Sequence, residues 1–307
     1  MATADNISTP ETRTEHDNQD VWSYQPELPL QEVPVFVWPP RIREAIGYFF
    51  SRTYLLSFLI PFGTLATLTW YFLQPELERC ATLEPGWIAQ LFARNFILIT
   101  IVAGGLHLYF HVFKLQGAEK KFDREDMQRK NSRFLGNDQV LDNMFWTLAS
   151  GVTFWTAYEV FFFWAYANQF LPHYLDIRNH PVAFVVLLLL IPFWSSLHFH
   201  FVHRLLHHRA LFKLAHAVHH RNVNLGPWSG LSMHPIEHLI YLSSVLIHLV
   251  IPSHPIHIIF HMQFISIGAS TGHTGFESIT FRGKPIIFLT AYTSVYGRST
   301  AHKAGGT

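Results

Sequence analysis

The stretch VAFVVLLLLIPFW at residues 182–194 decides the fold class, because it is an uninterrupted run of uncharged, apolar residues. It forms the main part of an apolar run from about Val182 to Val202. A helix needs about 20 mostly apolar residues to cross a bilayer, and this run is long enough. Three similar runs lie upstream, at about residues 55–73, 95–113 and 145–167. The sequence therefore predicts an all-α, polytopic membrane helical bundle.

The composition supports a membrane protein. Hydrophobic residues make up 49% of the chain and charged residues only 14%, whereas a soluble domain has about 25% charged residues. The net charge of +1 argues against nucleic acid as a partner. A single cysteine, Cys80, excludes an intrachain disulfide and a cysteine-based zinc finger. Histidine stands out, because its 21 copies nearly equal the 22 lysines and arginines.

The chain divides into three expected parts. Residues 1–40 are polar, lack an apolar signal-peptide core and are expected to be a disordered tail. Residues 41–140 are expected to hold a transmembrane pair and a basic cytosolic loop. Residues 141–307 contain the other apolar runs and the histidines. Within this part, Pro252 and Pro255 interrupt an apolar stretch at about residues 239–264, which predicts a helical hairpin or re-entrant pair.

Positive charge predicts the orientation of the bundle. Arginines precede the first span, and a basic segment at residues 114–133 follows the second. Basic loops of membrane proteins stay on the cytoplasmic side. The fourth span then brings its C-terminal end to the same side, where the histidine cluster begins. The expected result is a cytosolic, histidine-rich, metal-binding cap on the bundle.

Ten histidines fall within about forty residues at that end, and several have helical spacing. Residues three or four apart share a helix face, as in the pair His203 and His207 and in the trio His216, His219 and His220. We expect these five rings to converge in one small volume and to bind metal, since imidazole suits iron, zinc, copper and nickel. The full set is His198, His200, His203, His207, His208, His216, His219, His220, His234 and His238.

These motifs resemble those of the fatty acid hydroxylase/sterol desaturase superfamily. HRLLHH at residues 203–208 resembles its His-x3-His-His box, and HAVHH at residues 216–220 resembles its His-x2-His-His box. WSGLSMHP at residues 228–235 and GHTGFE at residues 272–277 resemble two further family stretches. The resemblance covers roughly residues 145–280.

The resemblance implies a membrane-bound non-haem di-iron enzyme that uses O2 and two electrons to hydroxylate or desaturate a lipid. Zinc is possible in place of iron. It also implies a separate electron donor, such as cytochrome b5 and its reductase, and an endoplasmic reticulum membrane. The histidines carried over as metal ligands are His203, His207, His208, His216, His219, His220, His234 and His273.

One family motif is missing from the sequence. The superfamily has a final His-x2-His-His box after the stretch that GHTGFE resembles, whereas here only His302 follows. The last part of the chain is therefore expected to be a truncated form of the family domain. We expect such a site to lack up to three ligands and to bind metal more weakly than a complete one, and His234 and His273 could complete a reduced site.

Other polar residues carry less specific signals. His107 and His111 are expected to form an interfacial pair, and the histidines at 248, 254, 257 and 261 are expected to be structural. Glu237 and Glu277 could orient imidazoles by accepting their N–H, and each could equally be a solvated carboxylate. Asn222 and Asn224 could hydrogen-bond near the site. Glu159 lies inside an expected span with no evident partner in the sequence.

Two other functions stay open beside the enzyme. A catalytically inactive family member could act as a membrane scaffold or binding partner of an active relative. A zinc-dependent transporter is a further alternative, although transporters place their ligands near the middle of the membrane. Here the histidines cluster at an expected membrane edge, beside arginines. The identity of the lipid and the choice between hydroxylation and desaturation are not encoded in any recognisable motif.

Overall fold

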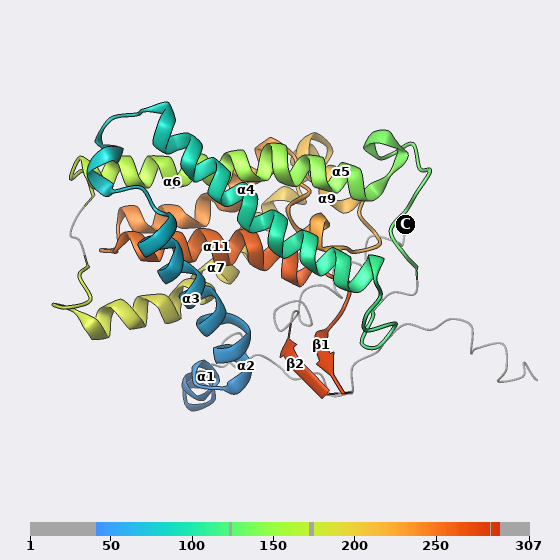
Figure 1. Cartoon of the computed structure of the whole chain (residues 1–307), viewed down its shortest axis with the longest axis horizontal. Coiled ribbons are helices and arrows are strands. Elements are labelled where there is room, and N and C mark those ends of the chain that lie inside the picture. Colours follow the sequence, from blue (N-terminus) through green and yellow to red (C-terminus); the bar gives the residue numbers. More distant parts are fainter. Residues whose placement is uncertain (1–40, 123–124, 172–174, 283, 289–307) are drawn as a thin grey trace, which may run out of the picture.

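The structure is a computed structural model that describes residues 41–122, 125–171, 175–282 and 284–288. The expected tail at residues 1–40 and His302 lie outside the described residues. Regular structure in the described part is almost entirely helical (Figure 1). Short π- or 3₁₀-helical stretches, labelled η, adjoin many of the α-helices.

The first half of the chain forms α1 to α6. Its elements are α1 (Ile42–Phe49), α2 (Arg52–Tyr54), η3 (Leu55–Leu59), α3 (Ile60–Leu68), η4 (Thr69–Leu73), η5 (Leu77–Ala81), α4 (Pro85–His107), η6 (Leu108–Val112), η7 (Leu135–Asn137), α5 (Gln139–Phe145), η8 (Trp146–Gly151) and α6 (Val152–Ala167).

The second half carries the histidine cluster. Its elements are α7 (Pro181–Leu206), α8 (Arg209–Leu211), η9 (Phe212–His216), α9 (Ala217–His220), η10 (Pro227–Leu231), α10 (Pro235–Leu242), η11 (Ser243–Leu249), α11 (Pro255–Gly272), β1 (Ser278–Phe281) and β2 (Lys284–Phe288). The two strands pair antiparallel, with Ser278 opposite Phe288. This small hairpin is the one sheet of the described residues and was not expected from the sequence.

Three helical runs of the described residues are long and apolar enough to cross a membrane: Leu55–Leu73, Pro85–Val112 and Pro181–Leu206. They confirm the polytopic membrane bundle and match the first, second and fourth expected spans. The second begins ten residues earlier than expected. The third expected span is helical from Gln139 to Ala167 but is not among the three. It carries buried polar side chains, including Asn143, Thr147 and Glu159, which lower its hydropathy.

Helix α11 is the centre of the bundle. It packs against α3, α4, α6 and α7, and α4, α6 and α11 lie side by side in Figure 1. A helix that is apolar on every side belongs in the core of a bundle, and α11 is buried along most of its length. Proline stands in the first turn of α4, α7, α10 and α11, where its missing N–H removes no helical hydrogen bond.

The expected hairpin around Pro252 and Pro255 is confirmed. Helix η11 ends at Leu249, α11 starts at Pro255, and the two arms fold back on each other. His248 Nε2 lies 3.0 Å from His261 Nδ1, and the Tyr241 hydroxyl donates to the carbonyl of Ile265. His261 Nε2 also lies 3.0 Å from the hydroxyl of Ser195 on α7. These histidines therefore join helices, as expected for structural residues.

A buried ion pair joins α4 to α6. Arg94 donates to Glu159, and both side chains are almost completely buried. Asn95 Nδ2 donates to the same carboxylate over 2.7 Å, and a second Arg94 N–H reaches Gln74 Oε1 over 2.7 Å. Glu159 therefore has a partner that could not be read from the sequence, because Arg94 lies 65 residues away.

Candidate metal centre

The first histidine pair lies at the C-terminal end of α7. His203 is in the last helical turn, and His207 is the residue that ends the helix. Because the two residues are four apart, their rings lie on one face. Their Nε2 atoms are 3.0 Å apart. The apolar helix α7 thus ends directly in two imidazoles.

The second pair comes from the short helical segment that follows. His216 is the last residue of η9, and His220 is the last residue of α9. Their Nε2 atoms are 2.9 Å apart. The turn at α8 folds this segment back against α7, so that the ring centroids of His203 and His216 are 4.9 Å apart. Both boxes therefore present their Nε2 atoms to the same small space.

Four ring nitrogens, one each from His203, His207, His216 and His220, all lie within 4.8 Å of one another. A tetrahedral ion with bonds of about 2.0–2.1 Å needs ligand atoms about 3.3 Å apart. The spacing of these nitrogens fits a single ion with a small contraction of the cluster. The convergence expected for these four histidines is confirmed, and this donor set fits iron or zinc.

His219 lies at the edge of this cluster and faces a further histidine. Its ring is 5.9 Å from that of His216 and 5.4 Å from that of His273, centroid to centroid. His273 Nδ1–H donates to the carbonyl of Ala269 over 2.8 Å, which leaves its Nε2 as a lone-pair donor. His219 Nδ1 is buried and has no hydrogen-bond partner among the described residues. The arrangement offers a second place for a metal ligand pair.

Besides His219 and His273, two further expected ligands stand outside the four-nitrogen group. His208 is exposed and occupies the residue before α8. His234 precedes α10, and its Nδ1 accepts the backbone N–H of Ile236 over 3.2 Å. His238 is fully buried. Its Nδ1 contacts the hydroxyl of Ser150 and its Nε2 contacts the carbonyl of Leu231. The hydrogen bonds of His234 and His238 indicate local structural roles for these two rings.

Burial keeps the imidazoles outside the spans neutral, which is the form that binds metal. It lowers the pKa of His220 to about 4 and that of His219 well below its usual value. Neighbouring histidines lower both pKa values further, because each would repel a second positive charge. The centre is therefore ready to bind a cation at neutral pH.

Glu237 contacts His216 on the side of the ring that faces away from the four-nitrogen group. Its Oε1 lies 2.7 Å from His216 Nδ1, and both side chains are buried. Burial raises the pKa of Glu237 and lowers that of His216, so the pair is uncharged when no cation is near. A cation on Nε2 favours the form in which Nδ1–H donates to the carboxylate. The expected role of Glu237 as a tautomer-fixing acceptor fits this contact.

Glu277 has a different environment. Its carboxylate forms an ion pair with Lys120 over 3.6 Å, between the hairpin region and the basic loop. His111 Nε2 lies 2.9 Å from the carbonyl of Thr274, in the same region. Glu277 and His111 thus fasten the segment after α11, and among the described residues neither joins the four-nitrogen group.

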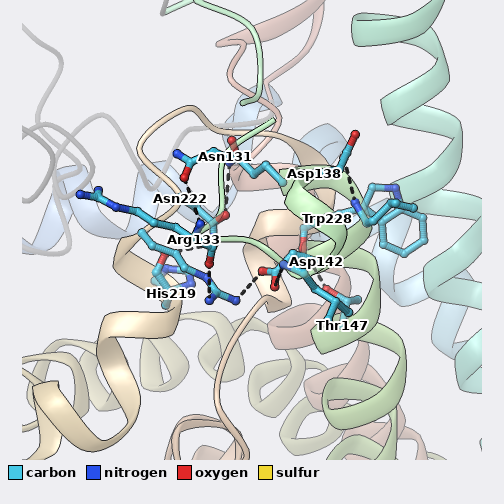
Figure 2. Close-up of polar contacts among 12 residues, drawn as sticks. Asn131, Arg133, Asp138, Asp142, Thr147, His219, Asn222 and Trp228 are labelled. Carbon is cyan, nitrogen blue, oxygen red and sulfur yellow. Dashed lines mark hydrogen bonds and ion pairs between the residues drawn. The ribbon is translucent and has the colours of Figure 1, made fainter. Parts of the chain in front are cut away.

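The polar residues after α9 contact the second box. Asn222 Nδ2 donates to the carbonyl of His219 over 3.1 Å (Figure 2), which confirms the expected hydrogen bond near the site. The sequence did not indicate Gln139, which donates to Asn222, or Asp142, which pairs with Arg221. The available signal was the placement of these polar residues at the start of an otherwise apolar helical run.

The family comparison agrees with this geometry. The model of the fatty acid hydroxylase family matches residues 184–303.

This region is a fatty acid hydroxylase domain.

The fatty acid hydroxylase domain includes most of α7, both histidine boxes, His234 and His273, and it confirms the superfamily resemblance of the motifs. It starts after α6, so that α4 to α6 precede it. Members of this family are generally oxidoreductases, typically iron-dependent. No curated protein and no solved structure matches the chain.

Replacing Glu237 by glutamine should weaken metal binding about 10- to 100-fold, because losing a carboxylate behind a ligating histidine has that typical cost. The measurement is competition with a chelator of known affinity, using the purified full chain. Glu277→Gln is the matched control, since Glu277 pairs with Lys120. Equal metal affinity in the two variants would show that Glu237 does not support the centre.

Proposed function

We propose that the chain is a membrane-bound non-haem iron oxygenase that hydroxylates or desaturates a lipid. Its electrons would come from a separate donor such as cytochrome b5 and its reductase. The observation that carries the proposal is the group of four histidine nitrogens within 4.8 Å of one another, inside a fatty acid hydroxylase domain and at the end of a membrane-spanning helix.

A bound iron would supply the oxygen chemistry needed to oxidise an unactivated C–H bond. The residues that would hold it are His203, His207, His216 and His220, with His219 and His273 beside them as candidates for a second metal. With an ion bound, Glu237 would accept the Nδ1–H of His216 across their 2.7 Å contact and so direct Nε2 toward the cluster. The burial of His216 and Glu237 excludes water from this side of the centre.

The surroundings of the centre favour a lipid substrate. Phe201 and Leu205, on α7 beside His203, are 63% and 53% exposed. Large apolar side chains at the end of a membrane span face lipid at no cost, whereas in water they would be unfavourable. A lipid chain lying in the bilayer can therefore reach the end of α7 from the side.

The test is lipid profiling under labelled oxygen. Cells expressing the full chain, supplied with ¹⁸O2, should contain either a lipid carrying one ¹⁸O atom or a lipid with one new double bond. His220→Ala should abolish the product. His180→Ala should retain it, because His180 is exposed at the opposite end of α7. The absence of any new lipid, with metal bound, would instead favour a non-catalytic scaffold.

We further propose that the histidine boxes face the cytoplasm of the endoplasmic reticulum membrane, on the basis of the basic segment at residues 114–133. An N-glycosylation site in a short Gly-Ser insertion at residues 178–180 should be glycosylated. The same insertion at residues 130–131 should not. The two positions lie before α7 and in the basic loop. The reverse pattern of glycosylation would place the boxes in the lumen.

A further inference from the structure

The second histidine box cannot fix its own orientation. Helix α9, Ala217–His220, is the last turn of a helical run that begins only at Arg209, and so short a run has little stability of its own. Contacts from elsewhere in the chain must therefore hold the rings of His219 and His220 against α7. The structure shows those contacts at the two residues that follow the box, Arg221 and Asn222.

Arg221 is held by the segment that leads into α5. Its guanidinium pairs with the carboxylate of Asp142, which is buried, and donates to the carbonyl of Arg133 over 3.1 Å. It also lies over the ring of Phe134, 5.5 Å from the centroid. A guanidinium fixed by two hydrogen-bond partners and an aromatic face has little freedom left. The residue next to His220 is thus immobilised.

Asn222 is held by Gln139, which is fully buried. Gln139 Nε2 donates to Asn222 Oδ1 over 3.2 Å and to the carbonyl of Asn224 over 2.7 Å. Asn222 Nδ2 in turn donates to the carbonyl of His219. Gln139 Oε1 accepts the backbone N–H of Gln128 over 2.8 Å. One amide therefore ties the basic loop to the backbone of the box.

Gln139 and Asp142, which hold Asn222 and Arg221, lie in a segment that is itself well fixed. Asp138 caps α5 by accepting the N–H groups of Val140 and Leu141. Asp142 Oδ1 also accepts the N–H of Leu135 over 3.1 Å. In the same helical run, the Thr147 hydroxyl donates to the carbonyl of Trp228 over 2.9 Å. The start of α5 is therefore a rigid support, and it lies outside the fatty acid hydroxylase domain at residues 184–303.

We propose that Asp142 and Gln139 are positioning residues of the metal centre, which extend the site beyond the matched domain. They hold the end of α9 and so set the rings of His219 and His220 against His203 and His207. This inference rests on the metal centre of the proposed function but not on its lipid chemistry. A metal affinity and a spectrum can therefore test it without any turnover.

The experiment uses Co²⁺ as the probe, with the metal-depleted full chain in lipid nanodiscs. Asp142→Asn removes the charge that fixes Arg221 and keeps the side-chain size. We expect its dissociation constant for Co²⁺ to rise about 10- to 100-fold, as for other groups that orient metal ligands. We also expect its visible Co²⁺ spectrum to change. Gln139→Glu, which removes the donor to Asn222, should act in the same direction and carries the test if Asp142→Asn does not fold.

The matched control is Glu159→Gln, which neutralises the carboxylate of the other buried ion pair. Glu159 lies seventeen residues beyond Asp142 on the same helical run, about 25 Å away at the rise of a helix. It should lower stability and leave the Co²⁺ affinity and spectrum unchanged. Wild-type Co²⁺ binding by Asp142→Asn, or an equal loss in both variants, would overturn the proposal. A wild-type chain that binds no Co²⁺ would overturn the metal centre as well.

Discussion

Replacing His216 by alanine is expected to lower the affinity of the purified chain for iron or zinc by more than about 100-fold. His216 is fully buried, contributes one of the four clustered nitrogens and is the ring that Glu237 supports. Even groups behind a ligand cost 10- to 100-fold when lost, so the loss of a ligand should cost more. Lipid oxidation should disappear with the metal.

The matched control is His180→Ala, at the opposite end of α7. Chelator competition gives the affinities of both variants, and thermal unfolding without metal checks that both fold alike. Undiminished metal binding by His216→Ala would remove the second box from the centre.

Replacing Glu159 by leucine is expected to lower the free energy of unfolding by about 3–5 kcal/mol, because it leaves the charge of Arg94 buried without its partner. Arg94 and Glu159 are among the most deeply buried charged side chains of the described residues. Unfolding in mixed micelles measures the change.

The double variant Arg94→Met with Glu159→Leu should recover most of this loss, since apolar side chains of similar volume often replace a buried pair without cost. Arg129→Ala is the surface control, because Arg129 is 71% exposed in its pair with Asp138 and should change stability by less than about 1 kcal/mol. A loss in Glu159→Leu no larger than in Arg129→Ala would show that the ion pair does not support the bundle.

The spans and the histidine spacing were predictable because both depend on local sequence. Apolar length alone identified Leu55–Leu73 and the run at about residues 182–202, which the structure extends to Pro181–Leu206. The i, i+4 spacing alone placed His203 beside His207, and His216 beside His220. The interruption by Pro252 and Pro255 likewise predicted the helical hairpin that the structure contains.

The long-range partners were not predictable, because nothing in local sequence links distant polar residues. Arg94 and Glu159 are 65 residues apart, and Asp142 and Arg221 are 79 apart. The third expected span was predicted from its apolar length, whereas buried polar side chains such as Thr156 and Glu159 lower its hydropathy and leave it outside the three candidate runs. The family motif also extended the ligand list to His208, which the turn before α8 leaves exposed.

The most direct measurement of the central claim is the amount of iron and zinc bound to the purified full chain, by mass spectrometry of metals after removal of loosely bound ions. The four converging nitrogens predict at least one equivalent of metal per chain. A variant with alanine at His203, His207, His216 and His220 should retain almost none. A folded wild-type chain with far less than one equivalent, or a variant that keeps its metal, would contradict the account.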